Sequence, residues 1–326
     1  MKNCYHGQQI FQKNVENQRK NKTAKRRSKF SQGTRYLPLT MQKRKNIDML
    51  RFYGGDVRER TDDGVLIDTC KDDLWSDKTA YRTLNALLFD GYENEKERIF
   101  KEGNKLNPVF VRRLKDTIKI YTGIFKLMCM EKQKKVSSFR ARRVDRKNSL
   151  NAYEKGCTQS FVSCSKGGYG TQFANKNQVI LLEVEVSGES PYIDFQQKLT
   201  EDEYIYYNEQ EILFPPFLPL KIEELALTKG EKKMIKDMHN NPPVGKYLIQ
   251  PGSFPDYREI IKSSKEELYQ RILQGKEEAS LCLERMNAGD WCSDYRSYEN
   301  WKKDFQDYLK LLYSDLWYEN GDIKED

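Results

Sequence analysis

Polar residues that could do chemistry stand in three short fragments whose other residues favour β-strands. Arg140 lies in the first fragment, Ser163 and Ser165 in the second, and Glu209 and Glu211 in the third. Side chains at positions i and i+2 of a strand point to the same face, so we expect the two serines to be neighbours, and likewise the two glutamates. An arginine supplies a permanent cation, serines supply hydroxyl groups, and glutamates supply proton-accepting carboxylates. On the strands of one sheet these groups would line a polar cleft.

The order of the three fragments resembles the Arg-Ser-Glu class of mono-ADP-ribosyltransferases, the cholera-toxin-like and clostridial-toxin-like enzymes that use NAD. That family carries an aromatic residue and an arginine on one strand, Phe-x-Ser-Thr-Ser on the next, and Glu-x-Glu followed by aliphatic residues on a third. The matching stretches here are "FR" at 139–140, "FVSCS" at 161–165 and "EQEILFPP" at 209–216. The hydrophobic "VILLEVEV" at 179–186 lies between the last two, as in the family, and the resemblance covers roughly residues 75–225.

The resemblance implies NAD as a substrate, no metal, and distinct roles for the three fragments. Breaking the bond between nicotinamide and ribose develops positive charge on the sugar. Glu211 corresponds to the carboxylate that stabilises this charge, and such a group accelerates the reaction because it binds the transition state better than the ground state. Ser163 would hold Glu211 and the nearby ribose in place. Arg140 would pair with the NAD phosphates, for which a planar, permanently charged fork is well suited.

Further NAD contacts are implied around these residues. Ser165 completes the serine motif, and the backbone at Ala141 would contact the nicotinamide amide, although many relatives have glycine there. Phe173 stands where relatives place an aromatic ring against nicotinamide, and Tyr169 competes with it for this role. The segment "KGGYG" (166–170) suits a loop that closes over the dinucleotide.

The motifs also depart from the family pattern. Arg142 and Arg143 add charge beside Arg140, so the identity of the phosphate-binding arginine stays open. Cys164 replaces the middle threonine of the serine motif, which is a small change. No G-x-G-x-x-G follows a strand, and this argues against a Rossmann dehydrogenase as the NAD-using class.

The acceptor side of the site centres on Glu209. A guanidinium is protonated at neutral pH, and a neighbouring carboxylate orients it and accepts its proton. Glutamate at this position accompanies transfer to arginine in the family, so arginine on a protein is the default acceptor. Tyr206 or Tyr207, in "EDEYIYYN", corresponds to the family's acceptor-recognition turn; the alternative is that these tyrosines pack a loop.

Helices must hold these fragments in place. Apolar residues at helical spacing predict two amphipathic helices within 61–130 and two more in the carboxy-terminal part. The stripes are Tyr81, Leu84, Leu87 and Leu88; Leu114, Ile118, Tyr121, Phe125 and Met128; Ile261, Leu268 and Ile272; and Trp301, Phe305, Tyr308, Leu309, Leu312 and Leu316. We interpret the first, second and fourth stripes as core-facing.

Short β-branched or alternating runs occupy the middle of the chain and predict strands. They are 136–144, 160–165, 179–186, 192–195, 209–214 and one run at 247–250. Helices, then strands, then helices indicate an α+β fold; the resemblance implies an ADP-ribosyltransferase-like β-sandwich core with flanking amino-terminal helices and a helical carboxy-terminal extension. We therefore expect an arm at 1–60, a catalytic domain at 61–225 and a mainly helical extension of unassigned role at 226–326.

The charge is concentrated at the amino terminus. Residues 1–50 hold 13 basic and two acidic residues, a net charge of +11, whereas the whole chain carries +8. Such an arm is either a flexible tail or a segment that seeks phosphate on nucleic acid or an anionic surface.

Three functions stay open. The first is a protein mono-ADP-ribosyltransferase, such as a bacterial toxin or effector, in a toxin–antitoxin or phage-defence setting or delivered into another cell. The second is an ADP-ribosyltransferase whose acceptor is RNA or DNA, which the basic arm favours and Glu209 disfavours. The third is a non-enzymatic binding protein with a degenerate cleft. The partners implied are a protein or nucleic-acid acceptor and, in the first setting, an antitoxin or chaperone.

Location is predicted from what the sequence lacks. No stretch approaches the roughly 20 apolar residues of a membrane-spanning helix, and no ordinary secretory signal is present. The seven cysteines form no C-x-x-C pair, and the chain has only two histidines. Reduced thiols and a cytoplasmic location are therefore expected.

Overall fold

The computed structural model of the chain describes residues 46–54, 58–60, 66–68, 80–89, 105–131, 138–168, 178–187, 190–201, 204, 207–239, 242–290 and 295–319. All the described residues belong to one compact unit, Leu39–Asp326.

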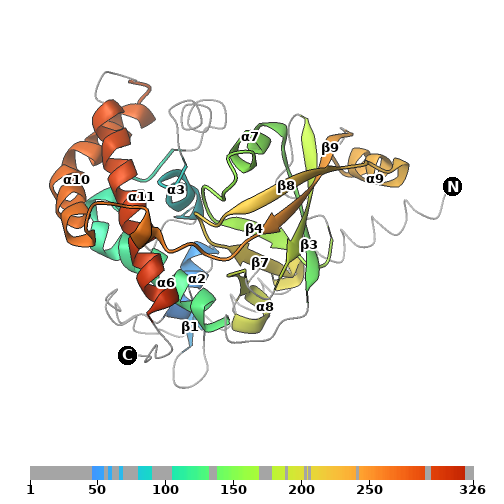
Figure 1. Ribbon diagram of the computed structural model, residues 1–326, viewed down its shortest axis with the longest axis horizontal. Helices are drawn as coiled ribbons and strands as arrows, with labels where there is room; N and C mark the ends of the chain where they lie inside the picture. Colours follow the sequence, from blue (N-terminus) through green and yellow to red (C-terminus); the bar gives the residue numbers. More distant parts are fainter. Residues whose placement is uncertain are drawn as a thin grey trace, which may run out of the picture. The chain divides into compact units, whose positions relative to one another are not determined.

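A seven-stranded mixed sheet carries the polar fragments (Figure 1). Its strand order is β6-β7-β4-β3-β5-β9-β8. The strands are β3 (Phe139–Arg146), β4 (Val162–Ser165), β5 (Val179–Val186), β6 (Ile193–Asp194), β7 (Glu211–Phe214), β8 (Leu220–Leu225) and β9 (Pro243–Pro251). Strands β5 and β9 run parallel, and the other neighbours run antiparallel. The Arg, Ser and Glu fragments therefore lie on the adjacent strands β3, β4 and β7.

Both faces of the sheet are covered, and strand β3 shows the difference between them. Ala141 belongs to the main hydrophobic core, whereas Val144 belongs to a small cluster with Val179, Leu181 and Ile235. Ile235 lies on helix α9 (Lys229–His239), which packs beside β9. Strand β5 is buried along nearly its whole length, as expected of an interior strand whose two faces both meet apolar layers.

Helices build the main core beside the sheet. They are α2 (Asn46–Tyr53), α3 (Ala80–Ala86), α5 (Val109–Arg112), α6 (Leu114–Glu131), α7 (Leu150–Tyr153), α8 (Phe195–Lys198), α10 (Lys265–Asn287) and α11 (Tyr295–Tyr318), with single 3-10 turns η3 (Lys147–Ser149), η4 (Tyr207–Glu209) and η5 (Tyr257–Glu259). Helices α10 and α11 lie side by side (Figure 1). Helix α10 begins at a capping box, in which Ser264 and Glu267 satisfy each other's backbone N–H groups.

Packed aromatic rings join the carboxy-terminal helices to α6. The rings of Phe125 on α6 and Tyr313 on α11 stack with centroids 3.9 Å apart, and Tyr121 on α6 meets Phe305 on α11 edge-on with centroids 5.6 Å apart. All four side chains are buried. Residues of the extension thus share one core with the helices that precede the sheet.

The predicted α+β class is confirmed, and so are the stripes of α6 and α11 as core-facing surfaces. Two details differ from the sequence predictions. Ile261 precedes α10, which begins only after the Ser264 cap. A two-stranded sheet of β1 (Arg58–Arg60) and β2 (Leu66–Asp68) places a strand in the stretch expected to be helical, where Val65 and Ile67 are β-branched.

The expected division at residues 60 and 225 stays a prediction, but two elements bear on it. Helix α2, inside the range assigned to the arm, buries Met49, Leu50 and Phe52 in the core. Strand β9, inside the range assigned to the extension, pairs with β5 and β8 of the sheet.

Candidate functional site

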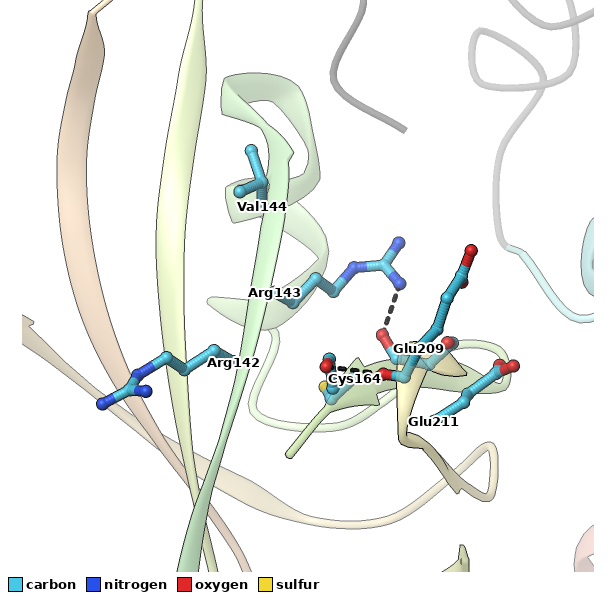
Figure 2. Close-up of a pocket in the computed structure, with 8 residues that line it drawn as sticks. Arg142, Arg143, Val144, Cys164, Glu209 and Glu211 are labelled. Atoms are coloured by element: carbon cyan, nitrogen blue, oxygen red, sulfur yellow. Dashed lines mark hydrogen bonds between the residues drawn. The ribbon is translucent and has the colours of Figure 1, made fainter. Parts of the chain in front are cut away.

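A pocket lies where strands β3, β4 and β7 meet (Figure 2). Ser165 of β4 pairs with Arg142 of β3 on one side and with Glu211 of β7 on the other. The lining residues are Arg142, Arg143, Val144, Ser163, Cys164, Ser165, Glu209 and Glu211. The guanidinium group of Arg143, two serine hydroxyls and two carboxylates thus lie around one pocket (Figure 2).

The arginine directed at the carboxylates is Arg143. Its Nη1 donates to the backbone carbonyl of Ser163 at 2.7 Å, and its Nε pairs with Asp145 at 2.8 Å. About 25% of the Arg143 side chain is exposed, so it remains accessible to a ligand. Figure 2 shows Arg142 and Arg143 leaving β3 on opposite sides, with Arg143 on the side of Glu209.

Asp145 keeps the Arg143 charge in place. Burial alone would raise the pKa of Asp145, but Arg143 and hydrogen bonds from Ser149 and the Arg146 backbone outweigh it and hold the pKa below its usual value. Burial would likewise lower the pKa of Arg143, yet the charge of Asp145 outweighs this and raises it. Both groups are therefore ionised at neutral pH.

Arg140, the arginine that the family pattern selects, is placed elsewhere. Its Nη1 pairs with Glu183 of β5 at 2.8 Å, and 53% of its side chain is exposed. Glu183 also receives Lys246 at 3.0 Å. Arg140 and Arg143 are three residues apart on one strand, and an odd spacing puts their side chains on opposite faces. Arg140 is not among the residues that line the pocket.

Glu211 is held by the Tyr204 hydroxyl, which donates to its carboxylate. Ser163 lines the same pocket. Burial raises the pKa of Glu211 above its usual value, and Ser163, Tyr204 and the nearby charge of Arg143 only partly offset this. When ionised, such a desolvated carboxylate interacts strongly with a nearby positive charge.

Glu209 reaches the pocket by a different backbone route from the one expected. It ends the 3-10 turn η4 instead of lying on the strand, which begins at Glu211. Between them Gln210 takes a left-handed conformation with φ of 51°. The alternation of an extended strand therefore does not relate the two glutamates, but the turn still brings both into the pocket. Strained backbone of this kind is common at functional sites.

The left-handed turn at Gln210 is held by its neighbours on the loop after β4. Its backbone carbonyl accepts from the Lys166 N–H at 3.1 Å. A Cβ at Gly167 would lie only 2.7 Å from Gln210 Oε1, so glycine leaves the space that the side chain uses. Ser165 donates to the backbone carbonyl of Glu209 at 2.7 Å. This serine therefore positions the glutamate turn.

Cys164 lines the pocket but is not a thiolate nucleophile. Burial raises the pKa of its thiol to about 12. Since only the thiolate reacts as a nucleophile, the pocket offers carboxylates, not sulfur, for neutral-pH chemistry.

The other predicted site residues fall into two groups. Ala141 is fully buried in the main core, and Tyr207, in η4, packs against that core and accepts a hydrogen bond at its backbone carbonyl from Gln196. Neither is among the lining residues. Phe173, Tyr169 and Tyr206 lie outside the described residues.

Sequence reasoning missed Asp145 and Tyr204. The Arg143-x-Asp145 spacing was a usable signal, because i and i+2 on a strand share a face and an acid there can pair with the arginine. Tyr204 had no such signal, because it lies outside the regular elements. Only the folded chain brings its hydroxyl to Glu211.

No group of three or more histidine, cysteine, aspartate or glutamate side chains in this part of the chain is arranged to hold a metal ion. Among the helices with described residues, none has the length and apolar character required to cross a membrane.

Comparisons with known proteins give structural matches only. No protein-family model and no curated protein matches the chain. The catalytic domain of VahC from Aeromonas hydrophila matches with a TM-score of 0.34 and 13% identity, over 64% of this chain and 97% of that one. Vis toxin, an ADP-ribosyltransferase from Vibrio splendidus, matches with a TM-score of 0.27 and 15% identity, over 53% and 67%. Plx2a, an ADP-ribosyltransferase toxin from Paenibacillus larvae, matches with a TM-score of 0.27 and 14% identity, over 53% and 92%.

Proposed function

We propose that this chain is an NAD-dependent mono-ADP-ribosyltransferase, which transfers ADP-ribose from NAD to a macromolecular acceptor and releases nicotinamide. The observation that carries the proposal is the convergence of Arg143, Ser163 and Glu211, from three adjacent strands, on one pocket. The same residue types follow one another in the same chain order in the Arg-Ser-Glu class that the sequence resembles. Arg143 takes the place that the sequence pattern gave to Arg140.

Glu211 is the proposed catalytic carboxylate. As nicotinamide leaves, the ribose becomes cationic, and a fixed anion beside it lowers the barrier without having to reorganise. The buried setting that raises the pKa of Glu211 also strengthens this interaction, because little water screens it. Ser163 holds the carboxylate through its hydroxyl.

Arg143 is the proposed phosphate-binding residue. It is ionised, partly exposed, and fixed by Asp145 and the Ser163 carbonyl. The pyrophosphate of NAD carries two negative charges that a planar guanidinium binds well. One pocket thus offers a cation for the pyrophosphate of NAD and a carboxylate for the ribose that becomes cationic.

Glu209 is the proposed acceptor-side residue, and arginine on a protein is the default acceptor. An acceptor guanidinium must be oriented and deprotonated as the new bond forms, and a carboxylate beside the pocket can do both. The resemblance is to toxin enzymes, so the setting we propose is a bacterial toxin or effector. Its antitoxin or chaperone partner would be sought by co-purification from the native host.

A second acceptor class is nucleic acid. The net charge of +11 on residues 1–50 favours it, because such an arm gathers RNA or DNA by releasing counterions. The chemistry at the ribose would be the same, and only the nucleophile would differ.

Labelled NAD distinguishes these outcomes. The protein is incubated with NAD labelled in the adenylate moiety and either total cell protein or total RNA, and the products are treated with protease or nuclease. We expect label that is lost with protease and released by hydroxylamine, as from an arginine conjugate. Label that resists protease and disappears with ribonuclease would assign an RNA acceptor. If the protein gave neither transfer of label nor release of nicotinamide, the proposed enzymatic function would be refuted.

A further inference from the structure

Tyr204 is in direct contact with the proposed catalytic carboxylate, yet it belongs to none of the motif fragments. Its hydroxyl donates to Oε2 of Glu211, and only 2% of the residue is exposed. Because this hydrogen bond is buried, water cannot readily replace it, and its loss would leave Oε2 of the Glu211 carboxylate without this donor and cost free energy.

The ring of Tyr204 is packed against two neighbours. It lies on Phe195 of α8, with ring centroids 4.9 Å apart. Gly54, directly after α2, lies against it as well, since a Cβ there would come within 3.0 Å of Tyr204 Cε2 and 3.4 Å of Phe195 Cε1. A glycine at this point lets the ring approach the helix end closely.

We propose that Tyr204 is a positioning residue for Glu211, whose hydroxyl fixes carboxylate oxygen Oε2, and that Gly54 sets the place of its ring. This inference rests on the proposed function, in which Glu211 faces the developing ribose cation. Tyr204 reaches Glu211 from the segment before η4, and Ser163 of β4 lines the same pocket, so hydroxyl groups from two separate elements flank one carboxylate. A clamped anion needs no reorganisation when charge develops on the sugar.

The groups around Glu211 determine how it titrates. Arg143 of β3 favours its ionised form, and burial opposes it. Tyr53 of α2 and Cys164 of β4 also face Glu211, and burial raises both of their pKa values, so each stays neutral near pH 7. Glu209 lines the same pocket. Loss of the Tyr204 hydrogen bond removes support for the ionised form, so the pKa of Glu211 should rise.

The test is Tyr204→Phe, which keeps the ring and removes the hydroxyl. We expect kcat for nicotinamide release to fall about tenfold, with KM for NAD changed by less than about twofold, because a clamp acts on the transition state more than on substrate binding. The acid limb of the pH–kcat profile should move to higher pH. A purely structural role would reduce the amount of folded enzyme and leave the limb in place.

Gly54→Ala supplies an independent route to the same result. The glycine is not in the left-handed region, so alanine adds a Cβ without backbone strain and displaces the Tyr204 ring. We expect a smaller loss of kcat in the same direction, and a double variant no worse than Tyr204→Phe alone. Tyr318→Phe is the matched control. Tyr318 ends α11, and its hydroxyl donates to the backbone carbonyl of Phe254. This variant should keep the wild-type kcat and the wild-type acid limb of the pH–kcat profile.

If Tyr204→Phe kept the wild-type kcat and the wild-type acid limb of the pH–kcat profile, the inference would be overturned. A second readout separates it from the proposed function: the titration of the Glu211 carboxyl carbon by NMR in protein labelled with 13C-glutamate, assigned by its loss in Glu211→Gln. If the wild-type protein released no nicotinamide, the proposed function would fail. A higher Glu211 midpoint in Tyr204→Phe would then still support the clamp, and an unchanged midpoint would refute it.

Discussion

Arg143 of β3 donates from Nη1 to the backbone carbonyl of Ser163 on β4 at 2.7 Å. The bond ties the cation of the pocket to the strand that carries the serine. The same guanidinium pairs through Nε with Asp145. Arg143 thus has a structural partner on each of two strands, and its fork geometry makes this possible where a lysine ammonium would serve as a single point charge.

Substitution of Arg143 tests its assignment against Arg140. We expect Arg143→Ala to reduce kcat/KM for NAD about a hundredfold or more, since it removes a charge-assisted contact and the tie to β4. Arg143→Lys should recover little of the loss. The measurement is nicotinamide release, with isothermal titration of NAD binding.

Arg140→Ala is the matched control on the same strand. Its side chain pairs with Glu183 and is largely exposed, so we expect kcat/KM within about threefold of wild type. A larger loss in Arg140→Ala than in Arg143→Ala would restore the arginine that the family pattern selects.

Substitution of Glu211 tests the catalytic carboxylate. Glu211→Gln keeps the size of the side chain and removes its charge, so both ADP-ribosyl transfer and NAD hydrolysis should fall about a thousandfold, since both pass through the same ribose cation. Titration of NAD should show binding within about fivefold of wild type, because the carboxylate acts on the transition state. Substantial residual hydrolysis would remove Glu211 from this role.

Substitution of Glu209 separates transfer from hydrolysis. Glu209→Gln should lose most transfer to an arginine acceptor, because the guanidinium loses its proton acceptor. Hydrolysis needs only water as nucleophile and should keep at least about a tenth of the wild-type rate. Equal losses of both activities would contradict the division of roles between the two glutamates.

The sequence was sufficient for the fold class and for the strands that carry the site. Helical apolar spacing located α6 and α11, because their stripes face the core. Short runs of β-branched and apolar residues located β4, β5 and β7. The order of the polar fragments along the chain indicated that their serines and glutamates share one cleft. These features depend on burial alone, which periodicity reports.

Residue-level geometry was not accessible from the pattern. The family motif selects Arg140, but side-chain alternation on β3 gives the pocket to Arg143, and nothing in "FRARR" reveals which face of the strand carries the pocket. The left-handed Gln210 broke the expected alternation of Glu209 and Glu211. The contact of Tyr204 with Glu211 depends on packing against Phe195 and Gly54, far away in the chain.

The pH dependence of wild-type activity follows from the desolvation of Glu211. Its pKa is raised above the ordinary 4.5. Because the proposed mechanism uses the ionised form, activity should fall as the pH drops through this raised pKa. The measurement is kcat for nicotinamide release between pH 4 and 8, with circular dichroism to follow folding. An acid limb at or below the ordinary value would contradict the buried setting.

Asp145 should stabilise the fold in a pH-dependent way. Its pKa lies below the usual value because Arg143 and its hydrogen-bond donors favour the ionised form, so the contribution is present above the unfolded pKa and is lost as pH falls through the folded one. At pH 7, Asp145→Asn should lower the free energy of unfolding by about 2–3 kcal/mol. This is less than for a fully buried pair, because part of Arg143 is exposed. Asp304→Asn, which breaks the exposed pair with Arg271, should cost less than about 1 kcal/mol.

Urea unfolding at pH 7 and pH 3.5 measures both variants. The difference between wild type and Asp145→Asn should shrink at the lower pH, and a difference that did not shrink would show that Asp145 acts through packing and not through its charge.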